Sequence, residues 1–292
     1  MCTVVTVLKK AAHISLSNLF LLLPQRIIGI TKITKIIVQT YLYDGIFDGF
    51  LTVIFDIYAS KSQPVQIIRE RLWQPGFFET PVCIVTDAAK SERVWNGIIN
   101  RSNKQVTRML YLAFASELPG VEMTLYNYLE KLFADATGKF HKNLLDDHSF
   151  ELYQISRKVS FEIHRFQGFV RFQETSDGLF FAAIEPDHDI LSLLAPHFAR
   201  RYGSQPWVIY DQKRDKGIFY KKPEMHEITL TDKQFNTITG DVLQQVKSGD
   251  EDLYRSLWKA YYKAINIPER KNTRLMLRLL PRRYWKYLPE KQ

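Results

Sequence analysis

The segment FVRFQETSDGLFFAAIEP, residues 169–186, marks the point at which the predicted secondary structure changes from helices to strands. Its two runs of β-type residues, FVRF and LFFAAIEP, flank the turn sequence Ser-Asp-Gly at 176–178, and this pattern is typical of a β-hairpin. A helix is predicted next, over residues 190–201. The runs WVIYD and GIFYK then predict a second hairpin that turns across residues 214–216.

The chain before this segment is predicted to be largely helical. Two short strands are expected, at residues 36–45 and 64–68, where β-branched and aromatic residues gather. Apolar residues at helical spacing predict the helices, which cover residues 47–60, 88–100, 103–117, 125–133 and 147–166.

Beyond the second hairpin, a long helix is predicted over residues 250–265. Its apolar residues are expected to be buried: Leu253, Leu257, Trp258, Tyr261, Tyr262 and Ile265. The predicted fold class is therefore α+β, with a largely helical N-terminal half, two β-hairpins separated by a helix, a long closing helix and a basic C-terminal arm. Three regions are expected: an appendage over 1–36, a mostly helical region over 37–145, and an α+β domain with the arm over 146–292.

The C-terminal arm, residues 263–292, holds most of the net charge of the chain. It carries nine basic side chains and two acidic ones, whereas the formal net charge of the whole chain is +9. The body between the two ends is nearly neutral. A basic segment of this kind favours an acidic partner, although net charge alone does not choose between nucleic acid and an anionic membrane.

The arm is predicted to contain a helix between Pro268 and Pro281, because proline suits a first helical position and blocks continuation. On that helix Arg270, Arg274 and Arg278 recur every four residues and would form one cationic face. Aromatic and basic residues alternate after Pro281, a mixture that contacts phosphates and stacks on bases. The candidate nucleic-acid contacts in the arm are Arg270, Lys271, Arg274, Arg278, Arg282, Arg283, Tyr284, Trp285, Lys286 and Tyr287. The alternative interpretation is a docked arm with a solvated basic face.

The first 36 residues are expected to be an appendage to the domain. They contain the apolar run ISLSNLFLLLP, which is interrupted by polar residues, lacks a small-x-small cleavage site before Arg26, and is shorter than the roughly 20 residues of a membrane-spanning helix. Neither export nor a membrane span is therefore predicted. Cys2 and Cys83 are the only cysteines and form no CxxC pair, so a reducing cytoplasm is the expected location.

Several common catalytic motifs are absent from the sequence. It contains no GxGxxG, GxxxxGK[ST], GxSxG or HExxH pattern, which argues against dinucleotide, P-loop, hydrolase and zincin chemistry. The remaining candidates for acid/base catalysis are His164, Asp187, His188 and His197. His164 is expected near a helix end, where it could complement the helix dipole or, oriented by Glu162, act in acid/base catalysis.

The triplet Asp187-His188-Asp189 precedes a predicted helix, so Asp187 could be a turn residue and Asp189 an N-cap. The same triplet could bind a metal, but adjacent residues point to opposite faces of an extended chain, and no metal site is predicted. His197, Arg200 and Arg201 share one face of the following helix, which suits phosphate contact or simply an exposed cationic helix end.

Four separated stretches of the sequence, in this order, resemble one known family. They are VSFEIHRFQGFVRFQET, IEPDHDILSLLAPHFARRY, WVIYDQKRDKGIFY, and NIPERKN followed by PRRYWKYLPE. The family is a group of bacterial DNA metabolism and DNA repair proteins whose C-terminal domain of unknown function also occurs fused to uracil-DNA glycosylases. The resemblance covers about residues 37–290 and implies a radical-SAM protein as partner, which would carry the cofactor. No cofactor of its own is expected for this chain, since it has no cluster of three cysteines for an iron–sulfur centre.

Three functional hypotheses follow from the residues and the resemblance. The first is a DNA-binding accessory protein in DNA repair or modification that acts with a radical-SAM partner, through the arm and through Arg200 and Arg201. The second is an enzyme on damaged DNA, glycosylase-like or hydrolytic, that uses the four candidate catalytic residues. The third is a structural docking partner without nucleic-acid contact. The resemblance carries over no catalytic residue.

Overall fold

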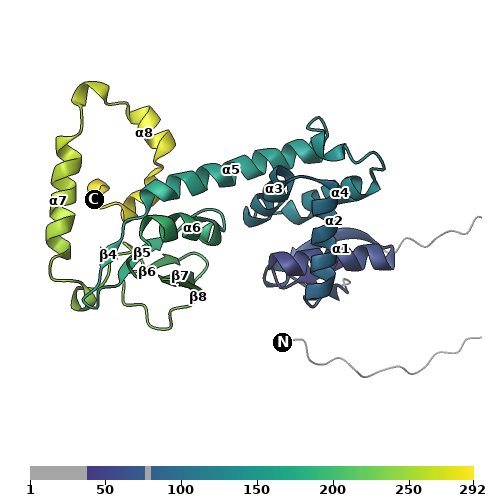
Figure 1. Ribbon diagram of the computed structural model, residues 1–292, viewed down its shortest axis with the longest axis horizontal. Coiled ribbons are helices and arrows are strands. Elements are labelled where there is room, and N and C mark those ends of the chain that lie inside the picture. The colour runs from purple at the N-terminus through teal and green to yellow at the C-terminus, as the bar shows by residue number, and fades with distance from the viewer. Residues whose placement is uncertain (1–37, 76–79) are drawn as a thin grey trace, which may run out of the picture. The chain divides into compact units, whose positions relative to one another are not determined.

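A computed structural model describes residues 38–75 and 80–292 of the chain, and it has the expected α+β fold. The expected appendage over residues 1–36 lies outside the described residues. The first sheet has three parallel strands in the order β2-β1-β3, formed by β1 (Val38–Tyr43), β2 (Gln63–Arg69) and β3 (Val82–Cys83). Helix α1 (Phe47–Ser60) connects the first two (Figure 1). The two strands expected from the sequence are confirmed, and the two-residue β3 was not predicted.

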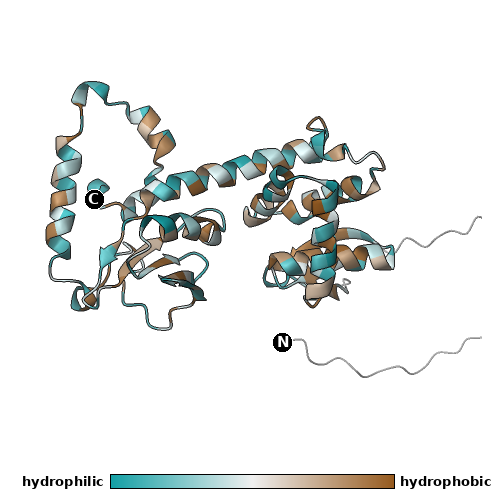
Figure 2. Cartoon of the chain, in the orientation of Figure 1, coloured by the Kyte–Doolittle hydropathy of each residue, from teal (hydrophilic) through white to brown (hydrophobic). Residues whose placement is uncertain are grey.

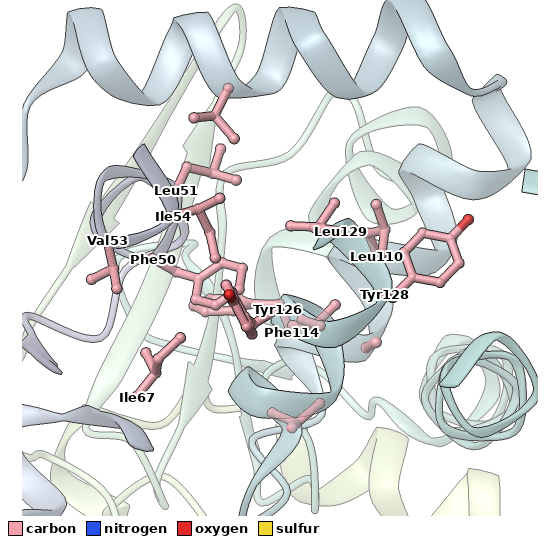
Figure 3. Packing of buried hydrophobic residues seen from close by; sticks show 14 of the residues in the cluster. Phe50, Leu51, Val53, Ile54, Ile67, Leu110, Phe114, Tyr126, Tyr128 and Leu129 are labelled. Carbon is pink, nitrogen blue, oxygen red and sulfur yellow. The ribbon is translucent and has the colours of Figure 1, made fainter. Parts of the chain in front are cut away.

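Four helices follow and pack with α1 around the first apolar cluster. They are α2 (Ala88–Arg101), α3 (Lys104–Ala115), α4 (Val121–Ala134) and α5 (Asp147–Phe169). Asp87, Asn103 and Asp146 cap three of them, each accepting hydrogen bonds from two backbone N–H groups in the first turn. Figure 3 shows Phe50, Ile54 and Phe114 inside this cluster.

The second sheet has five strands in the order β4-β5-β6-β7-β8. They are β4 (Gln173–Glu174), β5 (Phe180–Ile184), β6 (Trp207–Asp211), β7 (Lys216–Lys221) and β8 (Glu224–Ile228). Helix α6 (Leu191–Arg201) connects β5 to its parallel neighbour β6. The second predicted hairpin is confirmed as the antiparallel pair β6–β7.

The first predicted hairpin is confirmed only in part. The turn forms where expected, but the strand before it is the two-residue β4 and not FVRF. Helix α5 continues to Phe169 because Phe166 and Phe169, three residues apart, both pack on Tyr284, at ring-centroid distances of 5.0 and 5.8 Å. Strand β8 was not predicted, since its sequence EMHEI is mostly polar and exposed.

The chain then continues through the turn η3 (Gln244–Val246) to α7 (Glu251–Ala264) and α8 (Thr273–Leu279). The predicted helix over 250–265 is confirmed, but the predicted burial of its apolar face is wrong. Leu253, Leu257 and Ile265 are more than half exposed, and Figure 2 shows hydrophobic stretches along both helices. The amphipathic pattern predicts a helix with an apolar face, but it does not determine whether another part of the chain covers that face.

Residues 37–292 form one compact unit, in which α5 contributes to two apolar clusters. Leu152 and Ile155 belong to the first cluster, whereas Val159 and Ile163 belong to the second, which packs on the second sheet and α6. The expected boundary at 145/146 falls just before α5, and the division into two regions there remains a prediction. No helix in the described part of the chain is long and apolar enough to cross a membrane.

Candidate nucleic-acid interface

The helix of the C-terminal arm is shorter than the sequence predicts. Asn272 caps α8 by accepting a hydrogen bond from the backbone N–H of Leu275 at 2.9 Å, and residues Pro268–Arg270 form a separate 3₁₀ turn, η4. Arg270 therefore lies outside the helix, and the expected single face of three arginines is wrong. Only Arg274 and Arg278 share α8, one turn apart.

All five basic residues of the arm between positions 270 and 282 are exposed and form no ion pair within residues 38–75 and 80–292. We call them the arm cations: Arg270, Lys271, Arg274, Arg278 and Arg282. Among them, Arg282 lies over the ring of Trp285, 5.8 Å from its centroid. The backbone oxygen of Arg278 accepts a hydrogen bond from Arg165 of α5, which ties α8 to the body while the side chain of Arg278 remains exposed.

The residues after Arg282 are docked onto the body through the 3₁₀ helix η5 (Arg282–Tyr287). Arg283 forms an ion pair with Asp187, and Lys286 forms one with Glu185 at 2.5 Å. Hydrogen bonds from Lys286 and from the Tyr287 hydroxyl hold the pKa of Glu185 below its ordinary value. Arg283 and Lys286 are therefore partly neutralised within the molecule.

Tyr284 is buried and is not available to stack on a base, which corrects its place among the candidate contacts. Its ring is 1% exposed and packs on Phe166 and Phe169, and its hydroxyl donates a 2.6 Å hydrogen bond to Glu162 Oε1. Trp285 and Tyr287 are half-buried. The indole N–H of Trp285 donates to the backbone oxygen of Leu280 at 3.1 Å, so its ring is held in place next to the arm cations.

The loop at Asp187 and His188 is organised by the buried carboxylate of Glu162. The two oxygens of Glu162 accept the backbone N–H groups of Asp187 and His188 at 2.8 and 2.9 Å. His188 Nδ1 lies 2.9 Å from the backbone oxygen of Ser116, and Arg214 donates to the backbone oxygen of Asp187. These contacts fix the loop between α5, the end of α3 and the second sheet, and Glu162 has no part in orienting His164.

The candidate catalytic residues do not converge. His164 is exposed in the interior of α5 and not near its end, because the helix continues to Phe169. His197 lies in α6, where burial and the neighbouring cations Arg200 and Arg201 lower its pKa and so favour the neutral ring. Within residues 38–75 and 80–292, no hydrogen bond or ion pair joins any two of the four candidates. The arrangement expected for acid/base catalysis is therefore not formed.

A partly buried network of ion pairs, which sequence reasoning missed, connects the first sheet to the second. Glu117 Oε1 accepts hydrogen bonds from Arg69 and Arg71, and Glu117 Oε2 accepts one from Arg214 at 2.7 Å. Burial opposes the charge of Glu117, but the arginines outweigh it and its pKa is lowered. Asp211, fully buried beside Arg214, has a raised pKa because burial dominates there. The signal in the sequence was a charged residue at the end of each apolar strand, Arg69 in QIIR and Asp211 in WVIYD.

A pocket of about 1020 Å³ lies next to the docked part of the arm. The elements that line it are the C-terminal ends of α5 and α6, residues 170–174, β5, Trp207 at the start of β6, residues 239–241, helix α7, and Tyr287 and Pro289 of the arm. Among the candidate site residues, His197, Arg201 and Tyr287 line this pocket. Within the described residues no group of three or more His, Cys, Asp and Glu side chains is arranged to hold a metal ion.

The family profile of a domain of unknown function, DUF4130, matches residues 119–290 of the chain. No curated protein matches the sequence. The matched residues begin just before α4 and include α5, the second sheet, α7, α8 and η5, so the arm cations, Glu162 and the pocket all lie within the match. Because the match covers more than half of the chain, the protein belongs to the DUF4130 family.

Proposed function

We propose that this protein binds DNA through the arm cations and serves as an accessory protein in DNA repair or modification. The observation that carries the proposal is the set of five exposed cations without ion pairs over residues 270–282. Cations of this kind can bind phosphates without first breaking an internal ion pair. Lys259 and Lys263 of α7, also exposed, extend the same basic segment.

The anchoring of the arm supports the same proposal. Arg165 holds the end of α8 through the backbone, and Tyr284 anchors the residues that follow in the second apolar cluster. The arm cations are thus attached to the body at the C-terminal end of α8 and just beyond it. Holding cationic side chains near a fixed backbone reduces the conformational entropy that is lost when they bind a phosphate backbone.

The salt dependence of DNA binding tests this proposal. Fluorescence anisotropy with a labelled duplex, repeated over a range of salt concentrations, gives the slope of log K against log[salt]. Replacing Arg270, Arg274 and Arg278 together with Ala is expected to weaken binding and to reduce the slope by up to about 3, since each lost phosphate contact contributes about 0.9.

A matched variant controls for the loss of three positive charges. Lys104, Arg108 and Lys158 are exposed cations of α3 and α5 that lie outside the arm, and their joint replacement with Ala is expected to leave most of the affinity intact. Equal losses of DNA affinity in the two triple variants would mean that binding depends on the net charge of the protein and not on the arm. Unchanged binding in the arm variant would refute the proposal.

The second part of the proposal is a radical-SAM protein as partner, which would supply the cofactor chemistry. Its support is the family resemblance of the four sequence stretches. Co-purification of the two proteins after nuclease treatment is the expected result. A complex that disappears when nucleic acid is removed would show that DNA alone brings them together, and a complex that needs the arm but binds no DNA would support a docking role instead.

A further inference from the structure

We infer that the pocket beside the arm binds a single nucleotide. The inference deepens the proposed function. It rests on that function if the bound nucleotide is part of a DNA strand. The pocket adjoins the arm directly, because Tyr287 and Pro289 form part of its lining. Its volume of about 1020 Å³ lies at the upper end of the range of small-ligand sites and is ample for one nucleotide.

Aromatic rings line the pocket on two sides, and those on the side of α7 are exposed. On the side of the sheet, Trp207 is fully buried and stacks on Tyr220, with ring centroids 5.1 Å apart and planes 20° apart. On the side of α7, Tyr254 and Trp258 line the pocket and remain 58% and 37% exposed. The guanidinium group of Arg171 lies over the Trp258 ring, 5.1 Å from its centroid, so Tyr254 presents the more open ring. Aromatic rings that are not covered by the protein are the usual platform for a nucleobase, because every base has a π face.

The polar groups of the pocket match the edge of a base. Trp207 Nε1 and Arg171 Nε are buried donors that have no hydrogen-bond partner within the described residues. Glu251 lines the same pocket; its Oε2 accepts the backbone N–H of Glu174 at 2.9 Å, and its other oxygen supplies an acceptor. Burial raises the pKa of this carboxyl group. A buried donor without a partner is unfavourable, and a ligand with well-placed acceptors would restore the missing hydrogen bond. A planar ring that carries both hydrogen-bond acceptors and donors, such as a nucleobase, could form hydrogen bonds with these groups.

The rim of the pocket supplies cations for a phosphate. Arg201 lines the pocket at the end of α6, is exposed and forms no ion pair within residues 38–75 and 80–292. Arg200, its neighbour, is exposed as well. Arg255, another arginine of the lining, pairs with Asp241 at 2.7 Å. This ion pair neutralises the negative charge of Asp241, which would otherwise repel a phosphate. The chemistry of the pocket is therefore that of a base with one phosphate group, either free or in an unpaired stretch of DNA.

Binding experiments with the full chain separate these two sources. Equilibrium dialysis with the four deoxynucleoside monophosphates tests free nucleotides, and anisotropy with a short single strand and with a blunt duplex tests DNA. Trp207→Phe removes the indole N–H and keeps an aromatic ring, whereas Arg201→Ala removes an exposed cation whose side chain contacts the neighbouring Tyr202. Trp95→Phe is the matched control, since Trp95 packs on Phe47 and does not line the pocket.

We expect Trp207→Phe and Arg201→Ala each to weaken binding roughly fivefold to tenfold, with no change in Trp95→Phe. This pattern with the monophosphates would establish a free nucleotide as ligand, and the same pattern with the single strand alone would establish an unpaired nucleotide of DNA. If both pocket variants bind all three probes as the wild type does, the inference is wrong. In that case the proposed function still stands if the arm variant loses duplex affinity. If only the pocket variants lose affinity, and the arm variant does not, the proposed function is wrong and the pocket inference stands.

Discussion

Glu162→Gln is expected to be strongly destabilising, because one buried carboxylate joins α5, the loop at Asp187 and the C-terminal arm. Its oxygens accept three hydrogen bonds, from the backbone N–H groups of Asp187 and His188 and from the hydroxyl of Tyr284. In glutamine one oxygen becomes an NH₂ group. If the remaining oxygen keeps the bonds at Oε1, the amide then faces the N–H of His188, and that donor is left unpaired.

The magnitude follows from these contacts. Hydrogen bonds to a charged group contribute about 1.5–3 kcal/mol each, and an unpaired buried donor costs about 1–3 kcal/mol, so the free energy of unfolding is expected to fall by about 2–4 kcal/mol. With a urea m value of about 3 kcal/mol/M, the unfolding midpoint should fall by roughly 1 M. The control is Glu151→Gln on the exposed side of α5, where a change below about 0.5 kcal/mol is expected.

A double-mutant cycle with Tyr284→Phe tests the connection to the arm. Because Tyr284 and Glu162 share a hydrogen bond, their effects should not add, and a coupling energy of about 1 kcal/mol or more is expected. A loss below about 0.5 kcal/mol in Glu162→Gln, or additive effects in the cycle, would show that the loop and the arm are held by other contacts.

Three further predictions concern other parts of the molecule. Glu117→Gln should lower the free energy of unfolding by about 3–5 kcal/mol in urea denaturation, because it leaves the buried Arg214 without one of its carboxylates. The pKa values of Glu185 and Glu290 are lowered in the fold. Their contribution to the free energy of unfolding is therefore present above the ordinary value of 4.5 and is lost as the pH falls through the folded pKa values. Tryptophan fluorescence should report the resulting loosening of the arm in acid. Leu257→Glu on α7 should change stability by no more than about 0.5 kcal/mol, and a larger loss in thermal unfolding would show that another surface covers this face.

Local sequence signals predicted much of the fold. The β6–β7 hairpin has two dense β-type runs around a short turn, and both strands are central and buried, so local pattern and tertiary environment agree. The helices of the first half likewise carry apolar residues at a spacing of 3–4 and side-chain caps at Asp87, Asn103 and Asp146. Such signals lie within a few residues of the element that they specify.

Several of the errors share a physical cause, which is contact between residues far apart in the sequence. Phe169 is the last residue of a helix and not the first residue of the predicted strand, because it packs on Tyr284, more than 100 residues away. The role of Glu162 depends on the same residue and on the loop at Asp187. Composition showed that aromatic residues alternate with cations in the arm, but only the fold distinguishes Tyr284, which is buried, from Trp285, which is half-buried beside Arg282.

The charge of the arm also divides into two parts that the sequence cannot distinguish. Arg283 and Lys286 pair with Asp187 and Glu185, and Lys291 donates to the hydroxyl of Tyr262, so these cations hold the arm on the body. The cations before Arg283 have no such partners within the described residues, and they remain available to an external anion. Neutralising the first group would therefore loosen the docked part of the arm, which Tyr284 still anchors, whereas neutralising the second would weaken binding without changing how the arm is held. A loss of DNA affinity is informative about contact only when the substituted residues come from the second group.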